Sequence, residues 1–440
     1  MRRKEFPVYR VAKHVTVKVL AGVLWSVPLG AEAPAVYAIR GARVVTGKGP
    51  ILERATVIVR DGLIADVGAQ AAIPADAWVI EAEGLSVYPG LMDALSSLGL
   101  PEGSPATQRR PEPPSSAEAE RTEDVPVNSA WVRAADLLNP AERRIEAARN
   151  IGFTAAATFP MRGILCGQGA VIALAGDRPG EMVIHPSAGL YVTLTTRRGG
   201  GFPASLMGAI AYLRQVFLDA DHYEQARTIY NRNPAGLKRP EYDRALEALL
   251  ASPRVLLPAS TAVEIARMLR LAAEIRRTPV LYGGHEAWRS AELLRESGVS
   301  VIVSLKWPER DRDADPDVEE SLRVLEMREK APATPATLAK AGVRFAFSSA
   351  GLTDRRDFVR AVRRALNAGL SEADALRALT LHPAEIYGLS DRLGTVEPGK
   401  IANLVVTSGD LFQEQTEIKH VFVDGRKYQP IAISREEGRP

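Results

Sequence analysis

Apolar and polar residues alternate with a short period in the first part of this chain. Two β-branched runs, Ala55 to Val59 and Ile64 to Val67, are separated by the dipeptide Asp61-Gly62. An Asp-Gly pair between two such runs is a strong signal for a β-hairpin. The stretch from Val36 to Val87 therefore predicts a small antiparallel sheet. Such a sheet needs a further layer, because it cannot bury both of its faces alone.

The pattern after about residue 139 is one of strand-like runs that alternate with helical stretches. Asn139-Pro140 predicts a helix start, and Gly152 predicts its end before a strand from Phe153 to Phe159. Further strand-like runs follow at Val171–Ala175, Gly189–Leu194, Arg254–Leu257, Pro279–Tyr282, Val299–Val303 and Arg344–Phe347. Such alternation over about 300 residues predicts a parallel sheet, for which a closed (β/α)8 barrel is the commonest fold. Gly208 to Arg232 predicts a longer helix with no strand of its own.

The last stretch of the chain returns to the strand pattern. Ile401 to Val406 and Ile418 to Arg426 are β-rich and are accompanied by Pro-Gly and Asp-Gly turns. Pairing of this tail with the N-terminal strands would bury the faces that neither end buries alone. The predicted fold class is therefore α/β, with a (β/α)8 TIM barrel at residues 89–388. A small, discontinuous β-sandwich domain is expected from residues 34–88 and 389–430.

Composition narrows the classes of partner and site. The 440 residues are 46% hydrophobic and 25% charged, which is ordinary for a protein with a large core. The net charge is +3, but the basic residues are interleaved with Asp and Glu, so we expect no nucleic acid partner. The single cysteine, Cys166, excludes an internal disulfide and a thiolate metal cluster.

Two segments have the composition of processing or linking sequences. Residues 1–33 combine a basic lead, a mostly apolar run and Ala31-Glu32-Ala33, which predicts a secretory signal peptide and a periplasmic or secreted location. Pro34 is a poor neighbour for signal peptidase, so contact with a membrane through an uncleaved anchor is the alternative. Pro, Glu, Ser, Arg and Ala dominate the stretch at about 101–126, which predicts a disordered insertion after the first barrel strand.

Several separated motifs resemble one known family. They are Tyr88-Pro89-Gly90-Leu91-Met92-Asp93, Leu393-Gly394-Thr395-Val396-Glu397-Pro398-Gly399-Lys400 and Val421-Phe422-Val423-Asp424-Gly425. Together, in this order, they resemble amidohydrolases of the imidazolonepropionase-like group over nearly the whole chain after residue 33. The resemblance implies hydrolysis of non-peptide C–N bonds at the barrel mouth. There, in active relatives, histidines, a lysine or glutamate and an aspartate hold one or two divalent metals such as zinc.

The residues at the family's metal-ligand positions differ in this chain. The resemblance assigns the histidine pair after strand one to Leu95 and Ser97. It assigns the histidines after strands five and six to Pro258 and Gly283, and the aspartate after strand eight to Ala350. Because these side chains offer almost no metal ligand, we expect a degenerate site without a bound metal or other cofactor.

Few reactive side chains remain near the predicted barrel mouth. His285 and Glu286 are candidates for an acid, a base or a lone ligand, although one imidazole does not hold a metal and both residues suit a polar loop. Asp93 lies beside the ligands in the family, and here we expect it to hydrogen-bond the loop after strand one. Serines near the ligand positions would need an adjacent base to act as nucleophiles. These serines are Ser96, Ser97, Ser348 and Ser349.

Three functions are consistent with this sequence. The first is an exported non-catalytic partner or subunit, in a homo-oligomer or in a hetero-oligomer with an active amidohydrolase paralogue. It is favoured because the framework is kept while the ligands are not. The second is an active amidohydrolase with an atypical or metal-free site. The third is a small-ligand-binding protein that uses the emptied barrel pocket.

Overall fold

The computed structural model describes residues 36–101, 127–196, 202–310, 313, 315, 317 and 319–430. The chain divides into compact units at 1–33 and 34–440, and the first unit lies outside the described residues. The predicted signal peptide and nearly all of the predicted insertion at 101–126 therefore also lie outside them. Within the described part of the chain, no helix is long and apolar enough to cross a bilayer.

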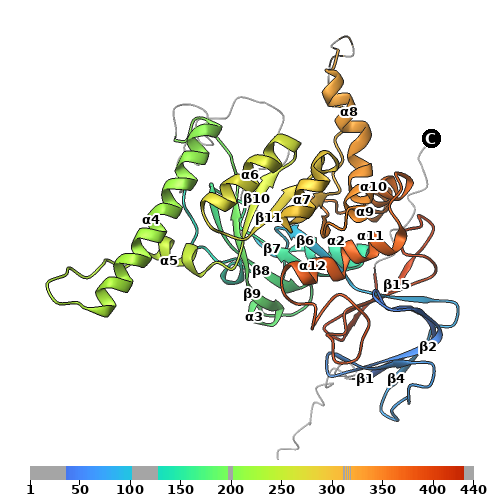
Figure 1. Cartoon of the computed structure of the whole chain (residues 1–440). Coiled ribbons are helices and arrows are strands. Elements are labelled where there is room, and N and C mark those ends of the chain that lie inside the picture. Colours follow the sequence, from blue (N-terminus) through green and yellow to red (C-terminus); the bar gives the residue numbers. More distant parts are fainter. Residues whose placement is uncertain are drawn as a thin grey trace, which may run out of the picture. The chain divides into compact units, whose positions relative to one another are not determined.

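Eight strands form a nearly closed barrel sheet, which confirms the predicted fold class (Figure 1). Their order around the sheet is β13-β12-β11-β10-β9-β8-β7-β6. The strands are β6 (Leu91–Ser96), β7 (Phe153–Thr158), β8 (Leu165–Ala173), β9 (Val183–Val192), β10 (Val255–Ala259), β11 (Pro279–Gly283), β12 (Ser300–Ser304) and β13 (Phe345–Ser348).

One strand departs from the predicted parallel arrangement. β8 is antiparallel to both of its neighbours, β7 and β9, whereas the other paired strands of this sheet are parallel. The reason is the connection at residues 159–164, which is shorter than the dozen or so residues that a parallel crossover needs. The chain therefore turns back directly after β7, and strand–helix alternation is interrupted until β10.

Several helices, such as α2, α6 and α10, bury one face in the same core as the barrel strands, whereas α8, which follows β12, has no buried residue (Figure 1). In α10, for example, Phe358 and Val362 are buried in the same core as Phe345 of β13. The helices are α2 (Arg143–Ile151), α3 (Pro179–Met182), α4 (Leu206–Arg232), α5 (Arg244–Ala251), α6 (Ala262–Glu274), α7 (Ala291–Ser297), α8 (Leu322–Lys330), α9 (Thr334–Lys340), α10 (Arg355–Asn367), α11 (Glu372–Leu379) and α12 (Leu381–Ile386), with 3-10 turns η1 (Ala134–Asp136), η2 (Ala287–Ser290) and η3 (Ala331–Ala333).

The first of these helices ends as predicted but begins later. Gly152 ends α2 with a left-handed φ of 109°. Its start is at Arg143, because the Glu142 carboxylate accepts a hydrogen bond from the Arg144 amide at 2.8 Å. Asn139 caps only a turn, in which its side chain accepts from the Ala141 amide at 3.1 Å. The cap that decides the helix start is therefore a glutamate, a residue type that is not among the common N-caps.

The second sheet joins the two ends of the chain. Its order is β16-β15-β14-β5-β1-β2-β3, and β4 also pairs with β1. β14 is antiparallel to β5, so the tail pairs with the N-terminal strands as predicted. All eight strands are hydrogen-bonded in one continuous sheet. They are β1 (Val36–Val45), β2 (Ile51–Arg60), β3 (Leu63–Gly68), β4 (Trp78–Glu81), β5 (Ser86–Pro89), β14 (Leu404–Thr407), β15 (Ile418–Val423) and β16 (Arg426–Tyr428).

Arg355 links the barrel helices to the loop between β14 and β15. Its Nη1 donates to the Ile151 carbonyl at 3.1 Å, and its Nη2 donates to the carbonyls of Leu411 and Thr416 at 3.2 and 3.3 Å. Burial lowers the pKa of this guanidinium to about 10. A single cation thus satisfies three carbonyls that come from two segments far apart in the sequence.

We expect Arg355→Ala to lower the free energy of unfolding by about 2–3 kcal/mol, because three carbonyls lose a charged donor. Arg355→Lys should recover only part of this loss, since one ammonium does not reproduce the planar fork. Urea unfolding followed by circular dichroism measures both effects. Arg356→Ala, at the exposed neighbouring position, is the matched control and should change stability by less than about 0.5 kcal/mol. Equal effects at the two positions would contradict the role of Arg355.

Candidate functional site

The positions singled out in the sequence meet at one end of the barrel. Leu95 lies near the end of β6, Pro258 near the end of β10, and Gly283 at the end of β11. Ala350 follows β13, which is paired with β12, and β12 is paired with β11. This is the carboxyl end of the parallel strands, where TIM-barrel enzymes carry their active sites. The structure therefore places these residues on the expected rim.

Asp93 is fully buried, and its carboxylate is hydrogen-bonded within the chain. Oδ1 accepts from the amides of Leu95 and Ser349, both at 3.2 Å. Oδ2 accepts from the Ser349 hydroxyl. Burial raises the pKa of Asp93 to about 6, against the opposing effect of these hydrogen bonds. The bond to Leu95 lies within β6 itself, and not in the loop after this strand, where it was expected. The other two bonds reach across to Ser349, in the segment after β13.

These bonds join the two ends of the barrel sheet. The sheet order begins at β13 and ends at β6, and the Ser348 hydroxyl donates to the Leu95 carbonyl at 2.7 Å across this gap. The same hydroxyl accepts from the Ala350 amide at 3.2 Å. Together with the bonds between Asp93 and Ser349, these contacts close the barrel by means of side chains. The two serines therefore serve the seam between β6 and β13.

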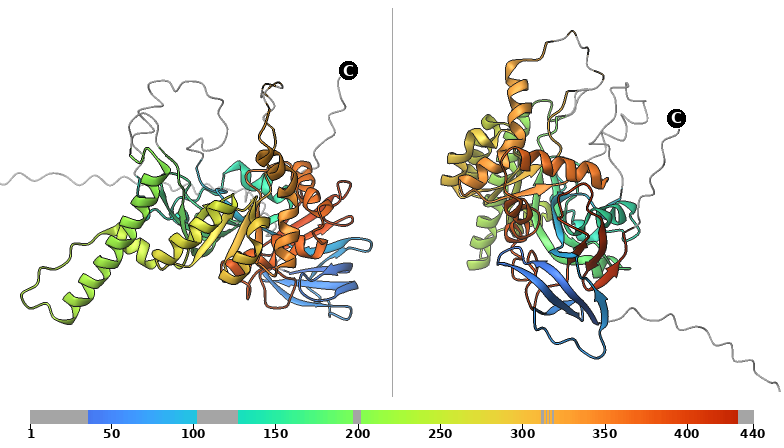
Figure 2. Two further views of the ribbon diagram at one scale, coloured as in Figure 1. Left: turned by 45° about the horizontal axis from the view of Figure 1, so that its top comes forward. Right: turned by 90° about the vertical axis from the view of Figure 1, so that its right-hand side faces the viewer.

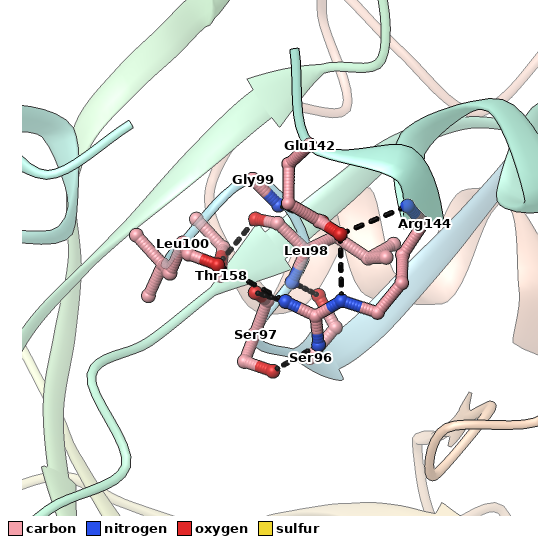
Figure 3. A network of polar contacts seen from close by, with 8 residues as sticks. All are labelled: Ser96, Ser97, Leu98, Gly99, Leu100, Glu142, Arg144 and Thr158. Atoms are coloured by element: carbon pink, nitrogen blue, oxygen red, sulfur yellow. Dashed lines mark hydrogen bonds and ion pairs between the residues drawn. The ribbon is translucent and has the colours of Figure 1, made fainter. Parts of the chain in front are cut away.

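The other two candidate serines have different partners. The Ser96 hydroxyl donates to the Ala157 carbonyl at 3.3 Å. The Ser97 hydroxyl accepts from Arg144 Nη1 at 3.0 Å, and the same guanidinium donates to the Ser97 carbonyl at 3.1 Å (Figure 3). Ser97 is thus held against the start of α2. The four serine hydroxyls have separate hydrogen-bond partners, and among these bonds only that of Ser349 is to a possible base, Asp93.

Arg144 was not a candidate in the sequence, and it organises the loop after β6. Besides Ser97, its Nη2 donates to the Leu100 carbonyl at 3.0 Å and its Nε donates to Glu142 at 2.8 Å (Figure 3). Glu142 in turn accepts from the Gly99 amide at 3.1 Å. The only sequence signal for this role is a charged pair at the start of a predicted helix. Such a pair is too common to identify a loop anchor.

A side chain at Gly283 would have to displace the Ser260 hydroxyl. The φ of Gly283 is +105°, a left-handed conformation that favours glycine, and an added Cβ would lie 2.5 Å from Ser260 Oγ. The next residue, Gly284, donates its amide to the Ala259 carbonyl at 2.9 Å, which holds the turn against β10. Ala350 also has a positive φ, of 51°, at the turn after β13. The backbone at these two ligand positions is therefore shaped as a tight turn.

His285 and Glu286 contact neighbouring loops and the start of α6. His285 Nε2 lies 3.3 Å from the Ser304 carbonyl, and burial lowers the pKa of its imidazole, which favours the neutral form. Glu286 is 3% exposed, and it accepts from the Ala262 amide, in the first turn of α6, at 3.0 Å. Its carboxylate also lies 3.6 Å from Arg323. These contacts match a loop and helix-start role for both residues.

The inside of the barrel below this rim is packed with aromatic and aliphatic side chains. Tyr191 lies 5.0 Å from Tyr282 and 5.7 Å from Phe159, measured between ring centroids, and Phe159 lies 6.3 Å from Tyr387. Leu95 is 9% exposed and belongs to the same buried cluster. One sequence signal for this filled interior was available. It is the large aromatic residue Tyr282, which immediately precedes the ligand position Gly283.

Two hydroxyls and one thiol in this interior are held in neutral form. The Tyr282 hydroxyl donates to the Val192 carbonyl at 2.8 Å, and the Tyr387 hydroxyl donates to the Ala94 carbonyl at 2.6 Å. Burial raises the pKa of the Cys166 thiol to about 12, so it is not a reactive thiolate. The site therefore offers no charged nucleophile among these groups.

The divalent metal that the resemblance implies would need ligand atoms from these residues. Leu95, Pro258, Gly283 and Ala350 have no side-chain N, O or S atom, and the hydroxyl of Ser97, the fifth ligand position, accepts a hydrogen bond from Arg144. Both carboxylate oxygens of the nearby Asp93 are engaged by donors of the chain. Within the described ranges, no group of three or more His, Cys, Asp or Glu side chains is arranged to hold a metal ion. The side chains at these positions do not fit a divalent cation, which needs several converging N, O or S ligands.

Comparisons with known proteins find similarity to the amidohydrolase family. The model of the amidohydrolase family matches residues 268–428. The crystal structure of an amidohydrolase from Thermotoga maritima MSB8 superposes with a TM-score of 0.74 and 25% identity, over 89% of this chain and 100% of that one. A Xaa-Pro dipeptidase, with a TM-score of 0.55 and 15% identity over 90% of this chain and 100% of its own, shares the fold.

Curated relatives match only a short segment of the chain. Adenine deaminase 3 of Rhizobium meliloti (strain 1021) is 45% identical over 67 residues, which are 15% of this chain and 11% of the deaminase. Adenine deaminase of Archaeoglobus fulgidus is 37% identical over 65 residues, again 15% of this chain and 11% of the relative. The matched segment thus covers about one tenth of the length of each deaminase.

Proposed function

The chain belongs to the amidohydrolase superfamily, and from this premise we propose that it is an exported, non-catalytic member that has lost the metal site and acts as a partner or subunit. The proposal rests on which side chains stand at the rim of the barrel. Leu95, Pro258, Gly283 and Ala350 stand at the ligand positions that the family resemblance assigns. Beside them, Asp93 is fully buried and hydrogen-bonded to Leu95 and Ser349.

Binding to another protein is the role that best explains why the fold is retained without the metal ligands. The barrel sheet and the second sheet are complete, while the interior beneath the rim is filled by rings such as Tyr191, Tyr282 and Tyr387. A filled interior favours neither catalysis nor the binding of a small ligand. We propose an active amidohydrolase paralogue as the partner, because a shared superfamily fold supplies related surfaces. Export rests on the composition of residues 1–33.

One observation favours a second function, a metal-free hydrolase. Asp93, with a pKa raised to about 6, accepts a hydrogen bond from the Ser349 hydroxyl, which is the arrangement of a base and a nucleophile. Against it, Asp93 is 0% exposed and Ser349 is 7% exposed, so a substrate carbonyl has no access to the hydroxyl. Ser349→Ala separates the two functions, since it would abolish any turnover by this route.

The zinc content of the purified full chain tests the proposed function. Elemental analysis after purification without chelators should find well below one zinc per chain. A panel of amide, lactam and aminopurine substrates should show no hydrolysis above the uncatalysed rate. An amidohydrolase with intact ligands, prepared in the same way, is the control. About one tightly bound zinc per chain together with hydrolysis of a panel substrate would refute the proposal.

Partnership requires a separate measurement. A tagged chain isolated from the native envelope, after mild cross-linking, should bring down an amidohydrolase whose metal ligands are intact. The same isolation with the tag alone is the comparison for non-specific capture. Isolation of the chain without any amidohydrolase paralogue would contradict this part of the proposal.

A further inference from the structure

An open groove lies between the last turns of α6 and α7. Its volume is about 450 Å³, within the range of sites that bind small molecules. The two helices are neighbours on the outside of the barrel sheet, in shades of yellow in Figures 1 and 2. Of the groove residues, Pro279 is the first residue of β11 and Val299 immediately precedes β12. The groove is therefore at the amino ends of these strands, whereas the candidate site lies at their carboxyl ends.

The lining of the groove combines apolar and basic side chains. Leu269 and Ala272 of α6 contribute apolar surface, together with Pro279 and Val299. Arg276 and Arg277, which follow α6, line the same groove. The lining residues that the structure describes include no acidic side chain. Such a lining suits a ligand that has both an apolar part and a negative charge.

Arg277 has hydrogen-bond donors that the described part of the chain leaves unused. Its Nε and Nη2 are buried, and neither has a hydrogen-bond partner among the described residues. Nη2 lies 3.6 Å from Oδ1 of Asp221, which is too far for a hydrogen bond. Buried donors without acceptors cost free energy. An anion in the groove, met by a small rotation of this side chain, would remove that cost.

Two guanidinium groups share one carboxylate beside the groove. Asp221 of α4 pairs with Arg276 and also lies near Arg277, so two positive charges face one negative charge. The carbonyls at the end of α6, which would repel an anion, are engaged by the chain. The Arg276 amide donates to the Ala273 carbonyl at 3.3 Å, and the Arg277 amide donates to the Ala272 carbonyl at 3.1 Å. The end of α6 is thus left with a surplus of positive charge.

We propose that this groove binds an anionic amphiphile, a molecule with a carboxylate or phosphate head on a short apolar chain. The head is held by the guanidinium groups of Arg276 and Arg277, and the apolar chain lies along Leu269 and Val299. A carboxylate and a phosphate share the oxygen acceptors that a guanidinium binds best. The inference does not depend on the proposed function, because it uses no residue of the barrel rim.

Isothermal titration calorimetry of the full chain with four probes tests the class of ligand. Octanoate and octyl phosphate carry both parts of the ligand, so at least one of them should bind, and the tighter one identifies the head. Octanol lacks the charge and acetate lacks the chain, so each should bind at least about ten-fold more weakly. Octanol that binds as tightly as the charged probes would overturn the anion site. Absence of binding by both charged probes would overturn the whole proposal.

Asp221→Asn separates a ligand site from a pair of arginines that only ties α4 to α6. The variant removes the carboxylate that competes for both guanidinium groups, so octanoate or octyl phosphate should bind at least about three-fold more tightly. A purely structural role predicts no tighter binding. Unchanged or weaker binding by this variant, with its fold checked by circular dichroism, would therefore count against the site.

Charge changes within the groove give an independent test in the same titration. Ala273→Glu, at an exposed lining position on α6, should weaken binding of the charged probe at least about ten-fold, whereas Ala273→Lys should not weaken it. Arg277→Met should also weaken binding at least about ten-fold. Arg267→Met is the matched control, because Arg267 is exposed on α6 and does not line the groove. Equal binding by the Ala273→Glu and Ala273→Lys chains would refute the site.

Discussion

Gly283→His, which restores a histidine at one ligand position, should lower the free energy of unfolding by about 3 kcal/mol or more and should not create a zinc site. Two costs combine. A β-carbon at a φ of +105° is strained by about 1–3 kcal/mol. The same atom would lie 2.5 Å from Ser260 Oγ, and overpacking of this kind costs about 1–3 kcal/mol. Urea unfolding with and without zinc is the measurement.

Two variants separate these costs. Gly369→His is the control for backbone strain, because Gly369 has a φ of +101° and an added Cβ would have only the Ala336 Cβ nearby, at 4.0 Å. It should cost about 1–3 kcal/mol. Ser260→Ala in the Gly283→His chain should recover part of the loss by removing the hydroxyl. If Gly283→His were as stable as the wild type, and were further stabilised by zinc, the rim would be able to adopt a ligand geometry. The proposed loss of the metal site would then be wrong.

Asp93→Asn should stabilise the protein at neutral pH and make no difference in acid. The pKa of Asp93 is raised to about 6 in the fold, against about 4 in the unfolded chain. The folded state therefore binds the proton more tightly. The associated stability is fully present below about pH 4 and is lost as the pH rises through about 6. Two pKa units correspond to a loss of roughly 3 kcal/mol, as an order of magnitude.

The amide variant retains the hydrogen bonds of the protonated form. Its Oδ1 can accept from the amides of Leu95 and Ser349, and its Nδ2 can donate to the Ser349 hydroxyl. At about pH 7.5 we expect Asp93→Asn to exceed the wild type by about 1–3 kcal/mol in the free energy of unfolding, with the difference vanishing near pH 4. Subtracting the two pH profiles removes the contribution of carboxyls whose pKa is lowered, such as Glu397.

Asp93→Ala provides the opposite test at the same position. It leaves the Ser349 hydroxyl and the amides of Leu95 and Ser349 without their acceptor, so it should destabilise the chain by about 2–4 kcal/mol at every pH. If Asp93→Asn were less stable than the wild type at pH 7.5, the buried group would be a charged carboxylate that the fold favours. The metal-free hydrolase would then gain support, because its base must be ionised to accept a proton.

The fold was largely predictable because its signals repeat. Alternating strands and helices predicted the barrel, and the β-rich tail predicted its pairing with the N-terminal strands, seen between β14 and β5. The direction of β8 was missed because the predicted parallel arrangement took no account of the short link at residues 159–164. The start of α2 was misplaced because Glu142, an uncommon cap, is preferred to Asn139 by its contacts with Arg144 and Gly99.

The candidate site, too, was predicted only in part. The sequence alone determined that Leu95, Pro258, Gly283 and Ala350 carry no donor atoms, because the atoms of a side chain do not depend on the fold. The direction in which a polar group points was decided only by the tertiary structure. Glu286 bonds to α6, and Ser97 bonds to Arg144. The sequence did not predict these bonds, because each partner lies far along the chain and is brought near only by folding.

The bond between Asp93 and Ser349 makes the same point, since 256 residues separate the two side chains. The sequence therefore determined which atoms are present at the rim. Tertiary structure alone decided that Asp93 is buried there at the seam between β6 and β13, because burial and hydrogen bonding depend on how segments distant in the chain pack together.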